Sequence, residues 1–252
     1  FSLQRALTKP EEIASKCKEY GYEACAITDF NTISGAVSFY KACKKHGIKP
    51  ILGCAFEIEN EIYTYVAKNK SGWYELIDLV TKYNSCTPDE MLTHMNSMGG
   101  DSNLIRVDHI QSKEVYYIHP DLAPLHRILL CSGMKTTLTR ANEKMKKSEV
   151  FSGYRKFFDR SDFSFPSPSE VRDLYTENEI AESNSIADQC EEYSILGKPV
   201  LPTFSCPDNF KEDEYLKCLC RKGWKKLLMN TGKITDEDQK AIYLNRIQKE
   251  ME

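Results

Sequence analysis

The first half of this chain alternates segments of helical periodicity with short, apolar, strand-like segments. Residues 8–21 and 34–47 have helical patterns, and apolar strand patterns follow at residues 23–28 and 50–58. Such alternation predicts βαβ units in an α/β fold, with a largely parallel sheet or barrel. Chemistry in these folds lies on loops beyond the carboxyl ends of strands, which here begin at Asp29, Cys54, Lys68, Asp108 and His119.

Helix boundaries are marked by local signals. Pro10 stands at the start of the first helical pattern and Gly21 at its end. Residues 87–90 and 167–170 each read Ser/Thr-Pro-x-Glu, which predicts two capping boxes with proline at the first helical position. A turn around residues 59–61 joins two β-rich segments, and the chain becomes helical after residue 165.

Composition excludes several classes of protein. With 41% hydrophobic residues and a net charge of -3, the chain is not intrinsically disordered, and no apolar run is long enough to span a bilayer. The ten cysteines include no Cys-x-x-Cys pair, which argues against a zinc ribbon and favours reduced thiols in a cytosolic protein. The start at Phe1 and the helical pattern at the other end favour a fragment of a longer protein.

Residues 127–160 are locally basic. Nine Lys or Arg residues stand against three Asp or Glu residues, a local net charge of +6. Aromatic residues are interleaved at Phe151, Tyr154, Phe157 and Phe158. This pattern suits contact with a nucleic-acid backbone, with candidate contacts at Arg140, Lys144, Lys146, Lys147, Arg155 and Lys156. The alternative, which we rank slightly higher, is a solvated basic hairpin or one that docks on an acidic neighbour.

Two further groups are candidate sites. Asp108, His109 and His119 form an Asp/His set whose spacing alone gives weak support to a metal site. Cys54 follows a strand-end glycine, and a buried thiol is favoured over a nucleophile because no histidine lies nearby in sequence.

Longer segments carry a family resemblance. Residues 7–54, and most specifically residues 34–54 (SGAVSFYKACKKHGIKPILGC), resemble the N-terminal PHP (polymerase and histidinol phosphatase) domain of family C replicative DNA polymerases, the DNA polymerase III alpha subunits. Segments that follow in the same order are similar to later parts of that family, at residues 66–80, 122–138, 166–175, 180–191, 200–204 and 212–227.

The resemblance implies an architecture. We expect a distorted PHP-type β/α barrel over residues 1–165, followed over residues 166–252 by a helical connector toward the polymerase palm. The connection at residues 85–113 is much shorter than is usual in the family, which would suit a divergent phage enzyme.

The resemblance also implies where metal ligands should stand. Family members use His, Asp, Glu and Cys at strand ends to hold a cluster of metal ions, which activate water for phosphoester hydrolysis. The first His-x-His of the family would precede Phe1. At the remaining positions Arg5 replaces an acid, Asp29 and Glu114 remain, and four positions have lost their ligands, namely Phe30, Ala55, Ile62 and Tyr116.

The function implied is that of one segment of a DNA-directed DNA polymerase, a nucleotidyltransferase of DNA replication. We expect no catalytic residue, metal or cofactor in this segment, because two carboxylates do not make a multinuclear site and Arg5 would repel cations. Mg²⁺ would serve the palm of the parent polymerase. Expected partners are the palm and thumb domains, primer–template DNA bound weakly, and other replisome proteins. The expected location is the cytoplasm, or the host cytoplasm for a phage, without membrane contact.

Two alternatives remain open. The first is a metal-dependent phosphoesterase, for example a 3′–5′ proofreading exonuclease. The second is an interaction module that binds another replisome protein.

Overall fold

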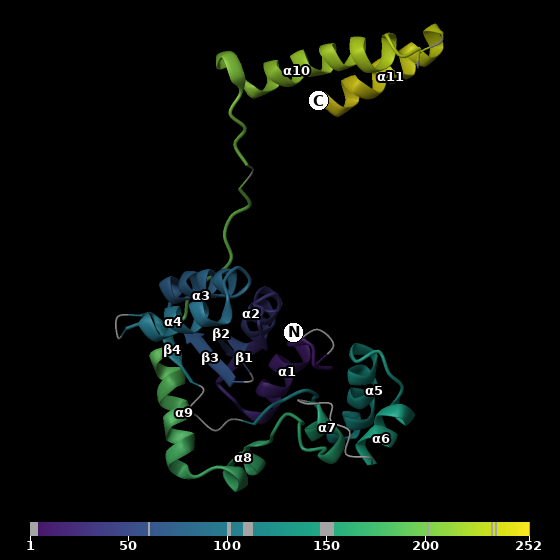
Figure 1. The fold of residues 1–252 in the computed structure, drawn as a ribbon. Coiled ribbons are helices and arrows are strands. Elements are labelled where there is room, and N and C mark those ends of the chain that lie inside the picture. Colours follow the sequence, from purple (N-terminus) through teal and green to yellow (C-terminus); the bar gives the residue numbers. More distant parts are fainter. Residues whose placement is uncertain are drawn as a thin grey trace. The chain divides into compact units, whose positions relative to one another are not determined.

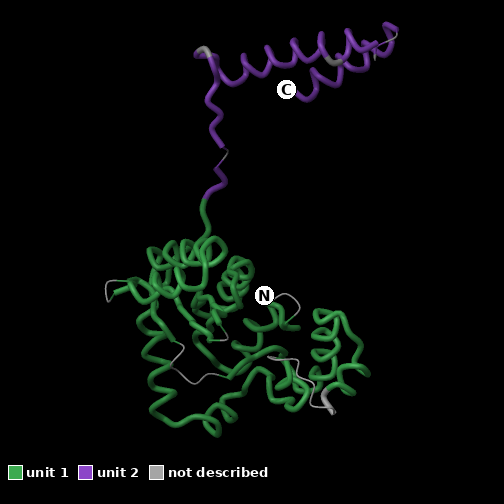
Figure 2. The backbone as a smooth tube through the Cα atoms, in the orientation of Figure 1, with its two compact units in different colours: residues 1–197 green, residues 198–252 purple. Residues whose placement is uncertain are grey.

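The computed structural model describes residues 5–59, 61–99, 102–107, 113–146, 154–200, 202–232, 234 and 236–251. The chain divides into two compact units, residues 1–197 and residues 198–252 (Figure 2). The domain boundary that is expected at residue 165 is a separate matter, and it stays a prediction. The range of the first unit contains the sheet and all of the expected site positions.

A four-stranded sheet with the order β1-β2-β3-β4 forms the centre of the first unit (Figure 1). Its strands are β1 (Ala24–Phe30), β2 (Lys49–Ile58), β3 (Glu61–Ala67) and β4 (Leu104–Arg106). β1 pairs with β2 in parallel, whereas β2–β3 and β3–β4 are antiparallel. The expectation of a largely parallel sheet was therefore wrong for the described strands. The connection from β2 to β3 is a tight turn, too short for the crossover that a parallel pair needs.

The described strands also leave the sheet open at β1 and β4, so they do not confirm a closed barrel. A second strand-like contact lies apart from this sheet. Tyr117 forms an isolated parallel bridge with Ser164, and the Leu7 amide donates to the Tyr116 carbonyl over 2.8 Å. Tyr116 and Tyr117 thus form a short ribbon held between residue 7 and residue 164.

Helices surround the sheet. In the first unit they are α1 (Pro10–Tyr20), α2 (Ala36–His46), α3 (Lys70–Tyr83), α4 (Pro88–Ser97), η1 (Pro120–Leu122), α5 (Ala123–Gly133), α6 (Leu138–Lys146), α7 (Arg155–Asp159), α8 (Pro168–Leu174) and α9 (Glu177–Gln189). α5, α6 and α7 lie together, away from α3 and α4 (Figure 1). The described parts of the basic region are largely helical, in α5, α6 and α7.

The two faces of the sheet are covered by different helices. Leu52, Cys54 and Phe56 of β2 belong to the main core, together with buried residues of α1, α2, α3 and α4. Ile51 and Val66 point to the other face, where they pack with Cys190 and with Ile186 and Ala187 of α9. Strand residues alternate between the faces, so neighbouring residues of one strand enter different cores.

The predicted helix boundaries are confirmed. Pro10 begins α1, and Gly21 ends it in the left-handed conformation with φ 75°. Thr87 and Ser167 each form a capping box with the glutamate three residues later. A further capping box at Thr176, which begins α9, was not predicted. Each box satisfies amide groups that the first helical turn leaves without a backbone partner.

The second unit contains η2 (Pro207–Asn209), α10 (Glu212–Gly223), a π-helical turn η3 (Trp224–Met229) and α11 (Glu237–Met251). No buried residue occurs in the described parts of α10 and α11. The described helices of the whole chain include none with the length and hydropathy needed to cross a membrane.

Candidate functional site

Three of the positions that the resemblance assigns to metal ligands, Phe30, Ala55 and Ile62, lie at one edge of the sheet, where β1 and β2 end and β3 begins. Phe30 is in register with Ala55, and Ile62 is in register with Glu57. Because side chains alternate along a strand, Phe30, Ala55, Glu57 and Ile62 lie on the same face of the sheet. Three of these four side chains are hydrocarbon, and the fourth is a carboxylate that the sequence analysis did not single out.

Asp29 lies on the opposite face. It is in register with Cys54, which belongs to the core packed by helices α1–α4, and only 8% of Asp29 is exposed. Burial raises the pKa of the Cys54 thiol to about 12, and the negative charge of Asp29 adds to this shift. The carboxylate that survives from the family motif therefore does not share a face with the other ligand positions.

Arg5 occupies the edge of the sheet instead. Its guanidinium forms an ion pair of 3.0 Å with Glu57 and lies 4.9 Å from the ring centroid of Phe30. The Glu57 backbone is itself fixed, because its amide donates to the Asn31 side chain over 2.9 Å and its carbonyl accepts from the Tyr83 hydroxyl. The guanidinium of Arg5, a cation, thus lies where the resemblance implies an acidic residue that binds metal cations.

Tyr116, at another ligand position, is the centre of a cluster of rings. Its ring centroid lies 5.3 Å from that of His126, 4.8 Å from that of Phe157 and 5.8 Å from that of Phe163. Tyr116, His126, Phe157 and Phe163 are all buried. Burial, followed by the nearby Glu114 carboxylate, raises the pKa of the Tyr116 hydroxyl. The phenol therefore stays neutral and provides no anionic oxygen for a cation.

His126 is held as a neutral ring. Its Nε2 atom lies 2.6 Å from the carbonyl oxygen of Arg5, and since a carbonyl can only accept, Nε2 carries the proton. Burial lowers the pKa of His126, the nearby positive charge of Arg127 lowers it further, and the bond to the Arg5 carbonyl opposes this shift. His126 is only 1% exposed, so it links α5 to the segment around Arg5 from inside the core.

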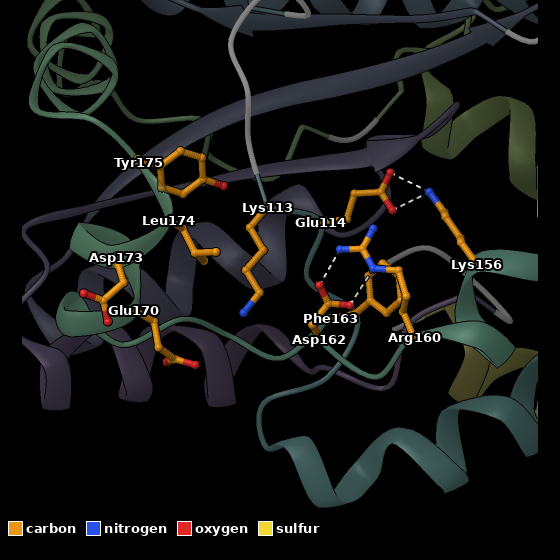
Figure 3. Close-up of a pocket in the computed structure, with 10 residues that line it drawn as sticks. All are labelled: Lys113, Glu114, Lys156, Arg160, Asp162, Phe163, Glu170, Asp173, Leu174 and Tyr175. Atoms are coloured by element: carbon orange, nitrogen blue, oxygen red, sulfur yellow. Dashed lines mark hydrogen bonds and ion pairs between the residues drawn. The ribbon is translucent and has the colours of Figure 1, made fainter.

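A pocket of about 510 Å³ lies beside the ring cluster (Figure 3). Carboxylate and cationic side chains line it together with Phe163, Leu174 and Tyr175. Lys156 forms an ion pair with Glu114, and Arg160 forms another with Asp162. Glu170, Asp173 and Lys113 complete the charged lining. Four carboxylates against three cations make this pocket unsuitable for a phosphate group.

The described residues at these positions do not supply the ligand set of a multinuclear metal centre. Among the described residues, no group of three or more His, Cys, Asp or Glu side chains lies close enough to hold one metal ion. Glu114, the other surviving carboxylate, already neutralises Lys156. Hydrocarbon side chains at Phe30, Ala55 and Ile62 have no ligand atoms, and Arg5 opposes a cation by like charge.

The candidate nucleic-acid contacts divide into two groups. Arg140 and Lys144 are exposed on α6, and the side chain of Lys146 and all of Lys147 lie outside the described part of the chain. On α7, Arg155 pairs with Asp159 over 3.2 Å and Lys156 pairs with Glu114. Phe157 is buried in the ring cluster, so it is not available to stack on a base. Contact with DNA stays a prediction.

Of the Asp/His set that was a candidate metal site outside the family pattern, the structure describes only one residue. Asp108 and His109 lie outside the described residues, and His119 is exposed ahead of η1. Cys54 is fully buried, with its thiol directed at the Asp29 carbonyl over 3.4 Å, as expected for a structural thiol.

Sequence reasoning missed Glu57 and His126. Glu57 stands two residues after Ala55, and a period of two places both on one face of β2, so strand alternation could have found it. His126 had no such signal, because its contacts to Arg5 and Tyr116 join segments far apart in sequence.

The state of His126 leads to a prediction for the pH dependence of stability. The unfolded chain binds a proton near the ordinary histidine pKa of about 6.5, whereas the native state resists protonation. We therefore expect the free energy of unfolding to fall as the pH is lowered from about 7.5 through 6.5, toward the lower native pKa. Urea unfolding at a series of pH values measures this slope.

His126→Phe should flatten that slope between about pH 7.5 and 5.5, above the range in which carboxylates titrate. His119→Gln is the matched control, because His119 is exposed and should leave the slope unchanged. An unaltered slope in His126→Phe would show that this ring titrates alike in the native and unfolded chain.

Comparison with known families identifies the class of this chain. The model of the PHP domain family matches residues 1–165, and the chain belongs to that family. Over most of its length the chain is similar to DNA polymerase III subunit alpha. It is 26% identical to that protein of Halalkalibacterium halodurans over 282 residues, covering 89% of this chain and 25% of the relative.

Two further relatives carry the same name. The protein of Bacillus subtilis is 26% identical over 309 residues, covering 100% of this chain and 27% of the relative. That of Buchnera aphidicola subsp. Schizaphis graminum is 38% identical over 89 residues, covering 32% of this chain and 8% of the relative. The chain spans about a quarter of the length of the first and second relatives. Since the Bacillus match runs over 309 residues and this chain has 252, that relative carries residues in the matched region that this chain lacks.

Proposed function

We propose that this chain is the PHP segment of a replicative DNA polymerase and acts as a structural module with no hydrolytic activity of its own. The single observation that carries the proposal is the Arg5–Glu57 ion pair, which lies against Phe30 at the strand ends where the family binds metal ions. Similarity to DNA polymerase III subunit alpha over most of the chain supports the role in replication.

In this proposal the palm and thumb domains of the parent polymerase are the partners, the palm uses Mg²⁺, and the location is the cytoplasm. A distorted β/α barrel remains part of the proposal. The backbone contacts that join residue 7 to Tyr116 and Tyr117 to Ser164, beside the four-stranded sheet, support it.

The test is the metal content and hydrolytic activity of the protein purified without a chelator. We expect well under one zinc, manganese or iron ion per chain by elemental analysis after buffer exchange. We also expect no release of nucleotides from 3′-labelled single-stranded DNA in the presence of Mn²⁺, because the site has no set of ligands that could hold adjacent ions.

Stoichiometric metal together with 3′–5′ hydrolysis would instead support the metal-dependent phosphoesterase. Mixing the chain with primer–template DNA and nucleotides should give no extension. Templated incorporation would contradict the assignment of polymerase chemistry to a palm outside this segment.

A further inference from the structure

We infer that the Arg5 guanidinium serves as an internal cation that cross-links the strand ends, in the place where related domains use metal ions. This inference rests on the function proposed above and deepens it. A divalent ion bound at strand ends does two things in a protein: it neutralises carboxylates, and it ties together segments that are distant in sequence. The contacts of Arg5 meet both requirements.

The first requirement is neutralisation of negative charge. Glu57 lies at the carboxyl end of β2 and pairs with Arg5 over 3.0 Å, with the two side chains 33% (Arg5) and 41% (Glu57) exposed. The Glu57 backbone is fixed by Asn31 and Tyr83, so its carboxylate leaves the sheet from a defined point. A guanidinium close to an oriented carboxylate forms a charge-assisted hydrogen bond, which is stronger than a neutral one.

The second requirement is a link between distant segments. The Arg5 guanidinium lies over the ring of Phe30 at the end of β1, at 4.9 Å, while its carbonyl accepts from His126 of α5. Two residues later, the Leu7 amide donates to the Tyr116 carbonyl. Arg5 and its neighbours thus hold β1, β2, α5 and the ribbon at Tyr116 together, and each of these segments comes from a different part of the chain.

An ordinary surface ion pair would not behave in this way. Ion pairs between exposed side chains usually contribute little stability, because solvent screens the charges and two long side chains lose conformational freedom. Lys45 and Glu11 form such a pair on the surface of the first unit, with side chains 68% (Lys45) and 52% (Glu11) exposed. Glu11 also bonds the His46 ring over 2.9 Å, so removing Lys45 leaves the carboxylate with a partner, and the pair offers an internal reference for an exposed charge interaction in the same protein.

The experiment compares thermal unfolding of the full chain with that of Arg5→Met, Arg5→Lys, Glu57→Gln, the Arg5→Met/Glu57→Gln double variant and Lys45→Met. We expect Arg5→Met to lower Tm by about 3 °C or more. Arg5→Lys, which keeps the charge and loses the planar fork, should recover part of that loss. The double variant should be less destabilised than the sum of the two single variants, whereas Lys45→Met should leave Tm almost unchanged.

Two results would overturn the inference. The first is a Tm of Arg5→Met equal to that of Lys45→Met. The second is equal destabilisation by Arg5→Lys and Arg5→Met, which would assign the effect to the shape of the arginine side chain and not to its charge. If Arg5→Met does not fold, Glu57→Gln alone against Lys45→Met decides between the same outcomes. These results leave the proposed function standing, since that proposal is tested by metal content, hydrolysis and templated extension and not by Tm.

Discussion

Ending the chain after residue 165 is expected to abolish its cooperative unfolding transition, although the family model ends there. The reason is that α9 and the residues after it cover one face of the sheet. Cys190 packs with Ile51 and Val66, and the Glu191 amide donates to the Lys68 carbonyl. Each apolar side chain buried there stabilises the fold by about 1.5–3 kcal/mol, against a total stability of about 5–15 kcal/mol.

The matched control is a chain that ends after residue 197, where the first compact unit ends. It should unfold in one cooperative transition when circular dichroism is followed against urea, because both cores are then complete. Equal unfolding midpoints for the two shortened chains would show that residues 166–197 are an extension and not part of the fold. That result would also support the domain boundary expected at residue 165.

Features set by local chemistry were predicted well. Pro10 and Gly21 bound α1, and the capping boxes at Thr87 and Ser167 begin α4 and α8, because each signal acts within four residues of its own position. The hairpin turn at residues 59–61 was also visible in the sequence. It should have outweighed the general preference of alternating helices and strands for a parallel sheet, since a short turn admits only antiparallel pairing.

Features set by long-range packing could not be predicted in the same way. The sequence shows that α9 is amphipathic, but the face of the sheet that it covers depends on contacts such as that of the Lys49 ammonium with the Ala187 carbonyl. The candidate site follows the same rule. Arg5 and the substituted ligand positions came from the family resemblance, whereas the pairing of Arg5 with Glu57 and His126 appeared only in the fold.

The basic region illustrates how one sequence pattern supports two interpretations. Interleaved aromatic and cationic residues are typical both of a surface that binds nucleic acid and of a helix packed through its rings. In α7 the second interpretation holds for Phe157, which is 5% exposed and contacts Tyr116, His126 and Phe163. Lys156 lies 5.2 Å from the centroid of the same ring and is paired with Glu114.

Phe157→Ala is therefore expected to lower the free energy of unfolding by about 3–5 kcal/mol, the usual effect of removing a buried ring that leaves a cavity. The ring of Phe157 contacts the rings of Tyr116, His126 and Phe163, so its removal leaves a cavity between α7, α5 and the ribbon at Tyr116. Urea unfolding of the variant and of the parent chain measures the difference directly.

Phe158→Ala is the matched control, because Phe158 is adjacent in sequence, identical in chemistry and only half-buried. It should cost about 1 kcal/mol or less, since a half-exposed ring leaves no cavity when it is removed. The pair also separates the two interpretations of the basic region. If Phe157→Ala left stability unchanged while weakening binding of single-stranded DNA, the ring would be a base-stacking residue and the packed cluster around Tyr116 would not exist in solution. Loss of stability in Phe157→Ala, with Phe158→Ala close to the parent, would show that the two neighbouring phenylalanines of α7 have different roles, one in the core and one at the surface.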